Sequence, residues 1–234
     1  MSHAEGDMEP SAQAQHIGAL SGGGAMSRSR KKAKSRAWAR NQNRDQHVRK
    51  ARMQGYRARS VFKLNEIDCK HRLINPSYWI ADLGAAPGGW CEYVSAKSSD
   101  RGRIVGVDIL EMQPIQGARI VRGDFTNPAV QKKIIDCFDG CLLDLVLSDM
   151  SPNISGIATV DQANAESIQV SILEFCGKAL KSGGSVLTKL FEGSSSPDVR
   201  KMYAEKFARI YMIKPGASRS ESREVYLLAK GYMT

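Results

Sequence analysis

The sequence lacks the residues that several common kinds of site require. Its five cysteines form no Cys-x-x-Cys pair, and of its four histidines only His71 lies beyond residue 60, in a polar Lys-His-Arg stretch. Zinc sites and disulfide frameworks usually show paired cysteines, and a Ser-His-Asp triad needs a well-placed histidine. We therefore expect free thiols in a reducing compartment, no metal site and no histidine-based hydrolase chemistry.

Long apolar runs are also missing. None approaches the roughly 20 residues that cross a bilayer. The opening MSHAEGDMEP is acidic and polar, unlike a secretory leader. These features predict a cytoplasmic protein without membrane attachment. The sequence leaves the oligomeric state open, with a monomer favoured.

The positive charge, by contrast, is abundant and gathered in one block. The net charge is +10, and residues 26–60 hold 13 Lys and Arg against one Asp, while residues 1–25 hold three acidic residues and neither Lys nor Arg. A basic block of this kind favours a polyanionic partner. Nucleic acid is the preferred interpretation, with a solvated tail and an anionic membrane surface as the alternatives.

These composition shifts predict three segments. Residues 1–25, rich in Gly, Ala and Ser, are expected to be a disordered leader or a cloning remnant, and residues 26–56 a basic RNA-binding arm. Trp38 and Tyr56 in that arm either stack on bases or pack on the folded domain. Residues 57–234 are expected to form that domain.

Within it, apolar strands alternate with helical segments, which predicts an α/β, doubly wound fold with a mostly parallel sheet. The last two strands are joined by a short polar stretch, and since a parallel pair needs a longer crossover, they should pair antiparallel. The expected helices cover 57–72, 89–97, 128–138 and 161–180, with a further one beginning near Pro197. The expected strands cover 77–84, 103–109, 118–124, 143–149, 185–191, 208–214 and 223–232.

The first strand runs into a Gly-rich turn, DLGAAPGGW, residues 82–90. Such turns bind ligands in doubly wound sheets. Gly84 and Gly89 match a G-x-G-x-x-G fingerprint, but Ala86 takes the middle position with Pro87 beside it. That bulk disfavours a pyrophosphate, and so a nicotinamide-dependent enzyme, but admits a smaller anion such as an amino-acid carboxylate. A tight turn without a ligand is the alternative.

Charged residues follow the next strands at the same edge of the sheet. Asp108 is placed to accept hydrogen bonds from ribose hydroxyls. Asp124 could accept from an exocyclic amine, or instead cap the helix that begins near residue 127. Asp149 ends the fourth strand, and Lys189 lies near the carboxyl end of the fifth, inside the apolar run SVLTKLF. An unpaired ammonium there would cost several kcal/mol, so Lys189 either has a function or reaches solvent from the strand end.

Taken together and in order, SVFKL, DLGAAPGGW, GVDI, RGDF, SDMSPN, LTKLFEG and SREVY resemble the FtsJ family of S-adenosylmethionine-dependent RNA ribose 2′-O-methyltransferases. The similarity is strongest to the bacterial group that acts on large-subunit ribosomal RNA, and it extends over about residues 35–232. It implies a Rossmann-like methyltransferase fold whose seven-stranded sheet ends in an antiparallel strand.

The resemblance also implies site residues and a substrate. Its catalytic Lys-Asp-Lys-Glu tetrad falls on Lys63, Asp149, Lys189 and Glu224, and its cofactor contacts fall on Gly88, Trp90, Asp108, Asp124 and Asp149. The implied methyl donor is S-adenosylmethionine, and the implied acceptor is a uridine 2′-hydroxyl of 23S-type ribosomal RNA in the assembled 50S particle. Ser151 and Val61 depart from the commonest family pattern without touching a tetrad position.

Lys189 is then the expected general base, which requires surroundings that favour the neutral amine, such as burial and the second cation Lys63. Asp149 and Glu224 would orient the two lysines. Two alternatives stay open: the same chemistry on transfer RNA or another RNA, and a non-catalytic RNA-binding module on a methyltransferase scaffold.

Overall fold

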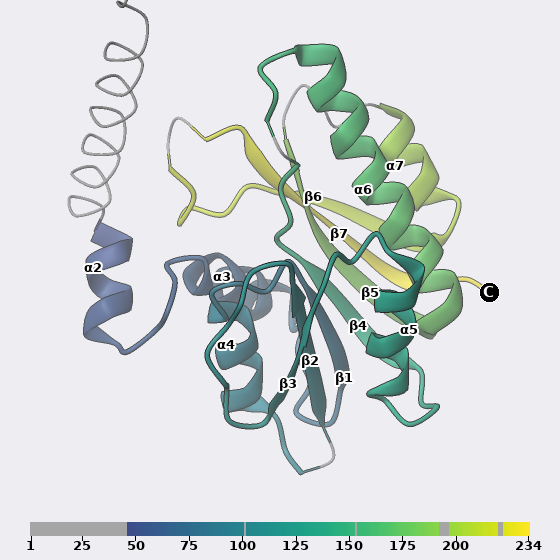
Figure 1. Cartoon of the computed structure of the whole chain (residues 1–234). Helices are drawn as coiled ribbons and strands as arrows, with labels where there is room; N and C mark the ends of the chain where they lie inside the picture. The colour runs from purple at the N-terminus through teal and green to yellow at the C-terminus, as the bar shows by residue number, and fades with distance from the viewer. Residues whose placement is uncertain (1–45, 101, 153, 192–196, 220–221) are drawn as a thin grey trace, which may run out of the picture. The chain divides into compact units, whose positions relative to one another are not determined.

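The structure is a computed structural model, and it describes residues 46–100, 102–152, 154–191, 197–219 and 222–234 (Figure 1). The predicted leader 1–25 and residues 26–45 of the predicted arm, including Trp38, lie outside the described residues.

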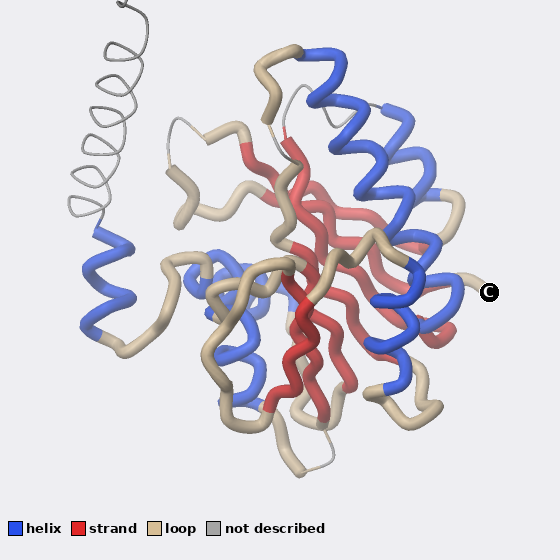
Figure 2. Tube along the Cα trace, viewed as in Figure 1, coloured by secondary structure: helices blue, strands red, loops and turns tan. Residues whose placement is uncertain are grey.

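One sheet of seven strands organises the domain, in the order β3-β2-β1-β4-β5-β7-β6 (Figure 2). Strands β1 to β5 pair in parallel, and β7 is antiparallel to both β5 and β6. This confirms the predicted α/β fold with its antiparallel last strand. The strands are β1 Trp79–Leu83, β2 Arg103–Asp108, β3 Ala118–Arg122, β4 Leu143–Ser148, β5 Leu180–Phe191, β6 Phe207–Ile213 and β7 Glu224–Tyr232.

Helices cover both faces of the sheet. Helices α3 and α4 pack on one face, and α5, α6 and α7 on the other (Figure 1). Each face has its own apolar layer, and β4 is buried at every position, as expected of a central parallel strand. The helices are α2 Gln46–Met53, α3 Val61–His71, α4 Gly89–Lys97, α5 Pro128–Asp136, α6 Ala158–Ala179 and α7 Pro197–Ala204.

Most element boundaries agree with the sequence pattern within a few residues, and the largest difference is at β5. This strand begins at Leu180, five residues before the predicted start, and α6 begins at Ala158 rather than 161. Leu180 is buried and pairs with Leu143 before the ladder shifts register. Gly183, with a φ of +78°, lies inside β5.

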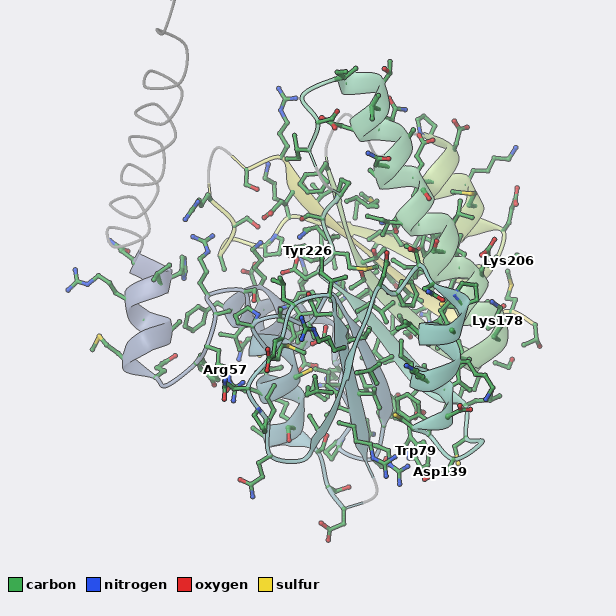
Figure 3. All side chains as sticks on the ribbon, viewed as in Figure 1. Arg57, Trp79, Asp139, Lys178, Lys206 and Tyr226 are labelled. Carbon is green, nitrogen blue, oxygen red and sulfur yellow. The ribbon has the colours of Figure 1, made fainter. Side chains whose placement is uncertain are left out.

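Arg57 fastens the start of the domain to the loops around the Gly-rich turn (labelled in Figure 3). Its Nε lies 2.5 Å from Glu92 Oε1 on α4, and its terminal nitrogens donate to the carbonyls of Gln113 and Pro114. Tyr56, just before it, packs edge-on against Phe62 with ring centroids 6.1 Å apart. Of the two alternatives for Tyr56, the structure therefore shows packing on the domain.

Candidate active site

A cavity of about 510 Å³ lies at the carboxyl edge of the parallel strands. Three of the predicted cofactor residues line it: Asp108 after β2, Asp124 after β3 and Asp149 after β4. Residues of the Gly-rich turn and of the first half of α6 complete the wall. The parallel order of β1 to β4 brings these acids together, because the carboxyl ends of parallel strands share one edge.

Asp108 ties the Gly-rich turn to the end of β2. Its Oδ2 accepts a hydrogen bond from the Ala86 backbone N–H at 2.9 Å, and its Oδ1 accepts one from Leu110 N–H at 2.8 Å. The carboxylate therefore holds two loops of the cavity in place while it lines that cavity.

The sequence left two roles open for Asp124, ligand contact and helix capping, and in the structure the capping role belongs to Asn127. Asn127 is the N-cap of α5, since its Oδ1 accepts from Ala129 N–H at 2.9 Å. Asp124 Oδ1 accepts from the backbone N–H and hydroxyl of Thr126, and the exposed carboxylate lines the cavity. Asp124 is thus not the helix cap.

Two glycines of the turn leave no room for a side chain. A Cβ on Gly84, whose φ is +75°, would lie 2.5 Å from Met150 Cγ, and one on Gly88, whose φ is +111°, would lie 2.6 Å from Ile115 Cδ1. Both combine a left-handed backbone with a close neighbour, which glycine alone accommodates easily. Gly88 is the N-cap of α4 and is not among the residues that line the cavity.

The four tetrad residues form two ion pairs. Lys63 Nζ lies 2.6 Å from Glu224 Oε2, and Lys189 Nζ lies 3.0 Å from Asp149 Oδ1. Lys189 Nζ also donates to the Asp149 carbonyl at 2.5 Å. The two lysine side chains are only 7% and 6% exposed, so neither reaches freely into solvent. The alternative in which Lys189 merely extends outward does not describe the structure.

Tyr226 connects the two ion pairs, and sequence reasoning did not single it out. Its hydroxyl donates to Asp149 Oδ1 at 2.7 Å and accepts from Lys63 Nζ at 3.4 Å (Tyr226 is labelled in Figure 3). Tyr226 follows Glu224 by two residues on β7, so the two side chains share one face of the sheet. The SREVY motif therefore contained this signal, through the spacing of its Glu and Tyr.

Burial and nearby charges set the protonation states of Tyr226 and Glu224. Burial raises the pKa of Tyr226 well above its usual value, and the negative charge of Asp149 raises it further, so the phenol stays neutral. Burial acts to raise the pKa of Glu224 as well, but the hydrogen bond from Lys63 and the positive charges of Lys63 and Lys189 outweigh it. Glu224 is therefore ionised at neutral pH.

Trp90 lies beside Tyr226 and is not among the residues that line the acidic cavity. Its indole Nε1 donates to the Ser60 carbonyl at 2.9 Å, and its ring centroid lies 5.9 Å from that of Tyr226. Ser60 is the N-cap of α3, three residues before Lys63. In this structure Trp90 supports the helix that carries Lys63, and its role in cofactor binding stays a prediction.

Asp82, in the middle of β1, is a second residue that sequence reasoning missed. It is fully buried; its Oδ2 accepts from Cys91 Sγ at 3.1 Å, and its Oδ1 has no hydrogen-bond partner in the described part of the chain. Burial raises the pKa of Asp82 to about 7; the Cys91 hydrogen bond opposes this and the charges of Asp149 and Asp108 add to it. An acidic residue within the apolar strand WIADL was the available signal.

The model of the FtsJ-like methyltransferase family matches residues 56–232. The chain belongs to this family. Membership makes the protein a methyltransferase and implies a methyl donor of the S-adenosylmethionine type, which confirms the predicted family and enzyme class.

Curated relatives and a solved structure agree. The chain is 42% identical to a protein of Alkalilimnicola ehrlichii named ribosomal RNA large subunit methyltransferase E, over 88% of this chain and 99% of the relative. It is 43% identical to a protein of the same name from Legionella pneumophila strain Corby, over 85% and 96%. A crystal structure from Plasmodium falciparum, named as a ribosomal RNA methyltransferase, superposes with a TM-score of 0.67 at 25% identity, covering 76% of this chain and 98% of the other.

A second cavity, of about 480 Å³, lies on the other side of the tetrad. Lys63 and Glu224 line it together with Arg59, Arg219 and Ser222, whereas Asp149 lines the first cavity. The chain of contacts from Glu224 through Lys63 and Tyr226 to Asp149 thus runs between an acidic cavity and a basic one.

Neither a metal centre nor a membrane helix is found in the described ranges. There, no group of three or more His, Cys, Asp or Glu is placed to hold a metal ion. No helix in the same residues is long and apolar enough to cross a membrane.

Proposed function

We propose that this protein transfers a methyl group from S-adenosylmethionine to the ribose 2′-hydroxyl of a uridine in large-subunit, 23S-type ribosomal RNA, in the assembled 50S particle. The observation that carries the proposal is the position of the tetrad. Its two ion pairs, joined through Tyr226, lie between a cavity lined by three carboxylates and a cavity lined by two arginines.

The acidic cavity suits this donor. S-Adenosylmethionine has a sulfonium and an ammonium, both positively charged, and also an exocyclic amine and ribose hydroxyls. Carboxylates attract the two cations and accept hydrogen bonds from the ammonium, the amine and the hydroxyls. Asp108 and Asp124 would hold the adenosine portion, Phe125 and Ile168 offer apolar surface beside it, and Asp149 faces the same space. When bound, the donor supplies a methyl group on a positively charged sulfur that departs as a neutral thioether, so no acid is needed.

The acceptor sets the chemical problem, since a ribose hydroxyl is a poor nucleophile while protonated. Lys189 is the proposed base that takes this proton, in its neutral amine form, since an ammonium has no free electron pair; such a base typically contributes about 10²–10⁴-fold. Asp149 holds the Lys189 Nζ through both its carbonyl and its carboxylate. Lys63, fixed by Glu224, places a positive charge at the site, which favours the neutral form of a neighbouring amine. Alignment of hydroxyl and methyl group can contribute up to about 7–11 kcal/mol more.

The basic cavity and the basic block fit an RNA acceptor. Arg59 and Arg219 offer guanidinium groups beside Lys63, and these pair well with phosphates. Arg59 is the last of the 13 Lys and Arg of residues 26–60, and the other twelve precede it in the chain. Large-subunit ribosomal RNA is the proposed target because the relatives carry it in their names. With that substrate, the proposed location is the cytoplasm, and the proposed active form is a monomer.

Methyl transfer in vitro and in cells tests the proposal. The purified protein is incubated with radiolabelled S-adenosylmethionine and, in parallel, 50S particles, protein-free 23S-type RNA and transfer RNA, all from cells without the protein. We expect labelling of the 50S particle, and loss of one uridine 2′-O-methyl group from ribosomal RNA, mapped by mass spectrometry, in cells without the protein. Labelling of transfer RNA alone would favour the alternative RNA, and labelling of nothing would favour the non-catalytic module.

A further inference from the structure

Gln169 lies directly behind Lys189, on the face of the sheet that α6 and α7 cover. It belongs to the middle of α6 and is only 4% exposed. Its Nε2 donates to the backbone carbonyl of Lys189 at 3.3 Å, and its Oε1 accepts from Thr188 Oγ1 at 3.1 Å and from the Tyr203 hydroxyl at 3.0 Å. One side chain thus joins three elements: α6, β5 and α7.

The chemistry of the partners decides how this amide is oriented. The Lys189 carbonyl can only accept, so the amide nitrogen must face it, and the two hydroxyls then donate to the amide oxygen. Thr188 and Tyr203 are both 0% exposed. In so dry a setting a satisfied polar network fixes its members firmly, and a missing partner is costly.

The position of this network along β5 is specific. The β4–β5 ladder ends at the pair Ser148–Thr188, so Lys189 lies one residue beyond the last backbone pair with β4. The Gln169 amide binds the strand at that residue. The same helix lines the donor cavity through Asn164, Ser167 and Ile168.

We propose that Gln169 is a positioning residue for Lys189: its amide holds the strand backbone so that the Lys189 amine stays against Asp149 and in line with the ribose hydroxyl. This rests on the proposed function, in which Lys189 takes the hydroxyl proton. A displacement of about 1 Å in a reacting group can cost about 10²-fold in rate. Removal of the amide should therefore lower kcat far more than it lowers substrate affinity.

Gln169→Leu is the test variant. Leucine approximates the volume of the amide but cannot bind the carbonyl. Alanine is unsuitable as a substitution. A cavity of about 10 Å³ already lies beside Gln169, Lys189 and Val199. The smaller side chain would enlarge it enough to admit a water molecule, which could replace the hydrogen bonds of the amide. We expect kcat to fall about 10–100-fold, with KM for S-adenosylmethionine and for the 50S particle changed less than about 3-fold.

Gln131→Leu is the matched control. Gln131 is also 4% exposed, but it lies on α5, and its amide oxygen accepts from Lys178 Nζ of α6 at 3.1 Å rather than from β5. Both variants are assayed at a temperature at which thermal melts show them folded. We expect Gln131→Leu to lower the melting temperature and to leave kcat within about 2-fold of the wild type.

Gln169→Glu supplies a rescue, and it carries the test if the leucine variant does not fold. A protonated carboxyl can donate to the Lys189 carbonyl as the amide does, whereas a carboxylate cannot. Relative to wild type at each pH, the kcat of Gln169→Glu should rise as the pH falls from 9 to 6. The same ratio for Gln169→Leu should stay constant.

Lys189→Ala, assayed in parallel, separates this inference from the proposed function. An inactive Lys189→Ala beside a Gln169→Leu of normal kcat overturns the positioning role and leaves the function intact. Equal decreases of kcat in Gln169→Leu and Gln131→Leu, or a pH-independent ratio for Gln169→Glu, also overturn it. A Lys189→Ala variant with normal turnover overturns both.

Discussion

The ammonium of Lys63 lies 2.6 Å from the carboxylate of Glu224, although 161 residues separate the two in the chain. Lys63 belongs to a helix that precedes the sheet, and Glu224 begins the last strand. Because β7 inserts between β5 and β6, its first residues come to the same edge as the end of β5, where Lys189 lies. The insertion of one strand thus completes the tetrad.

Lys189→Ala should abolish methyl transfer and leave S-adenosylmethionine affinity within a few-fold. The reason is that Lys189 is proposed to act on the acceptor, and it is not among the residues that line the acidic cavity. Single-turnover transfer and calorimetric titration of the donor measure the two effects separately. Lys132→Ala, on the exposed surface of α5, is the control and should transfer normally. Near-normal turnover of the Lys189 variant would falsify its assignment as the base.

Tyr226→Phe should lower kcat by about 10-fold or more with little change in donor affinity. The substitution removes the hydroxyl that donates to Asp149 and accepts from Lys63, and so disconnects the two ion pairs. A tenfold decrease corresponds to about 1.4 kcal/mol, close to the lower end of the roughly 1.5–3 kcal/mol of a hydrogen bond to a charged group. Tyr211→Phe on β6 is the matched control. Equal kinetics for the two variants would show that the connection has no catalytic effect.

Asp82→Asn should change how stability depends on pH. The pKa of Asp82 is about 7 in the folded protein and about 3.9 in the unfolded chain. The protonated carboxyl therefore contributes fully to the free energy of unfolding below pH 4, and this contribution is lost as the pH rises to 7. The decrease is about 1.4 kcal/mol per pH unit in that window. The asparagine side chain does not titrate in this pH range. Urea unfolding should therefore show the free energy of unfolding of the variant, minus that of wild type, rising from pH 4 to 7 and constant above. A difference that does not vary with pH would contradict the shifted pKa.

Neutralising the basic block should weaken RNA binding and reduce its salt dependence. The variant replaces the six Lys and Arg between residues 28 and 36 with Gln. It leaves α2 intact, whose Val48 and Ala51 are buried. Each Lys or Arg that pairs with a phosphate contributes about 0.7–0.9 to the slope of log K against log salt, so its replacement should reduce the slope by that amount. Filter binding to the 50S particle at several salt concentrations gives the slope, and an unchanged slope would show that these residues do not touch phosphate.

Sequence alone predicted the kind of fold and most residues of the candidate site. Alternating strands and helices predicted the parallel sheet, because each element's apolar pattern follows its own period. Asp108, Asp124 and Asp149 could be placed at one edge because parallel strands all end there. Lys189 was a candidate because an unpaired cation within an apolar strand is energetically costly.

Other features depended on contacts between distant segments. The insertion of β7 between β5 and β6, the position of Trp90 behind α3 and the burial of Asp82 are not local properties, so no short stretch of sequence contains them. The same holds for Tyr226 between the ion pairs and Gln169 behind Lys189. Periodicity and turn chemistry act over a few residues and determine the elements themselves. Which side chains then meet is decided by how those elements pack, and only the tertiary structure determines that.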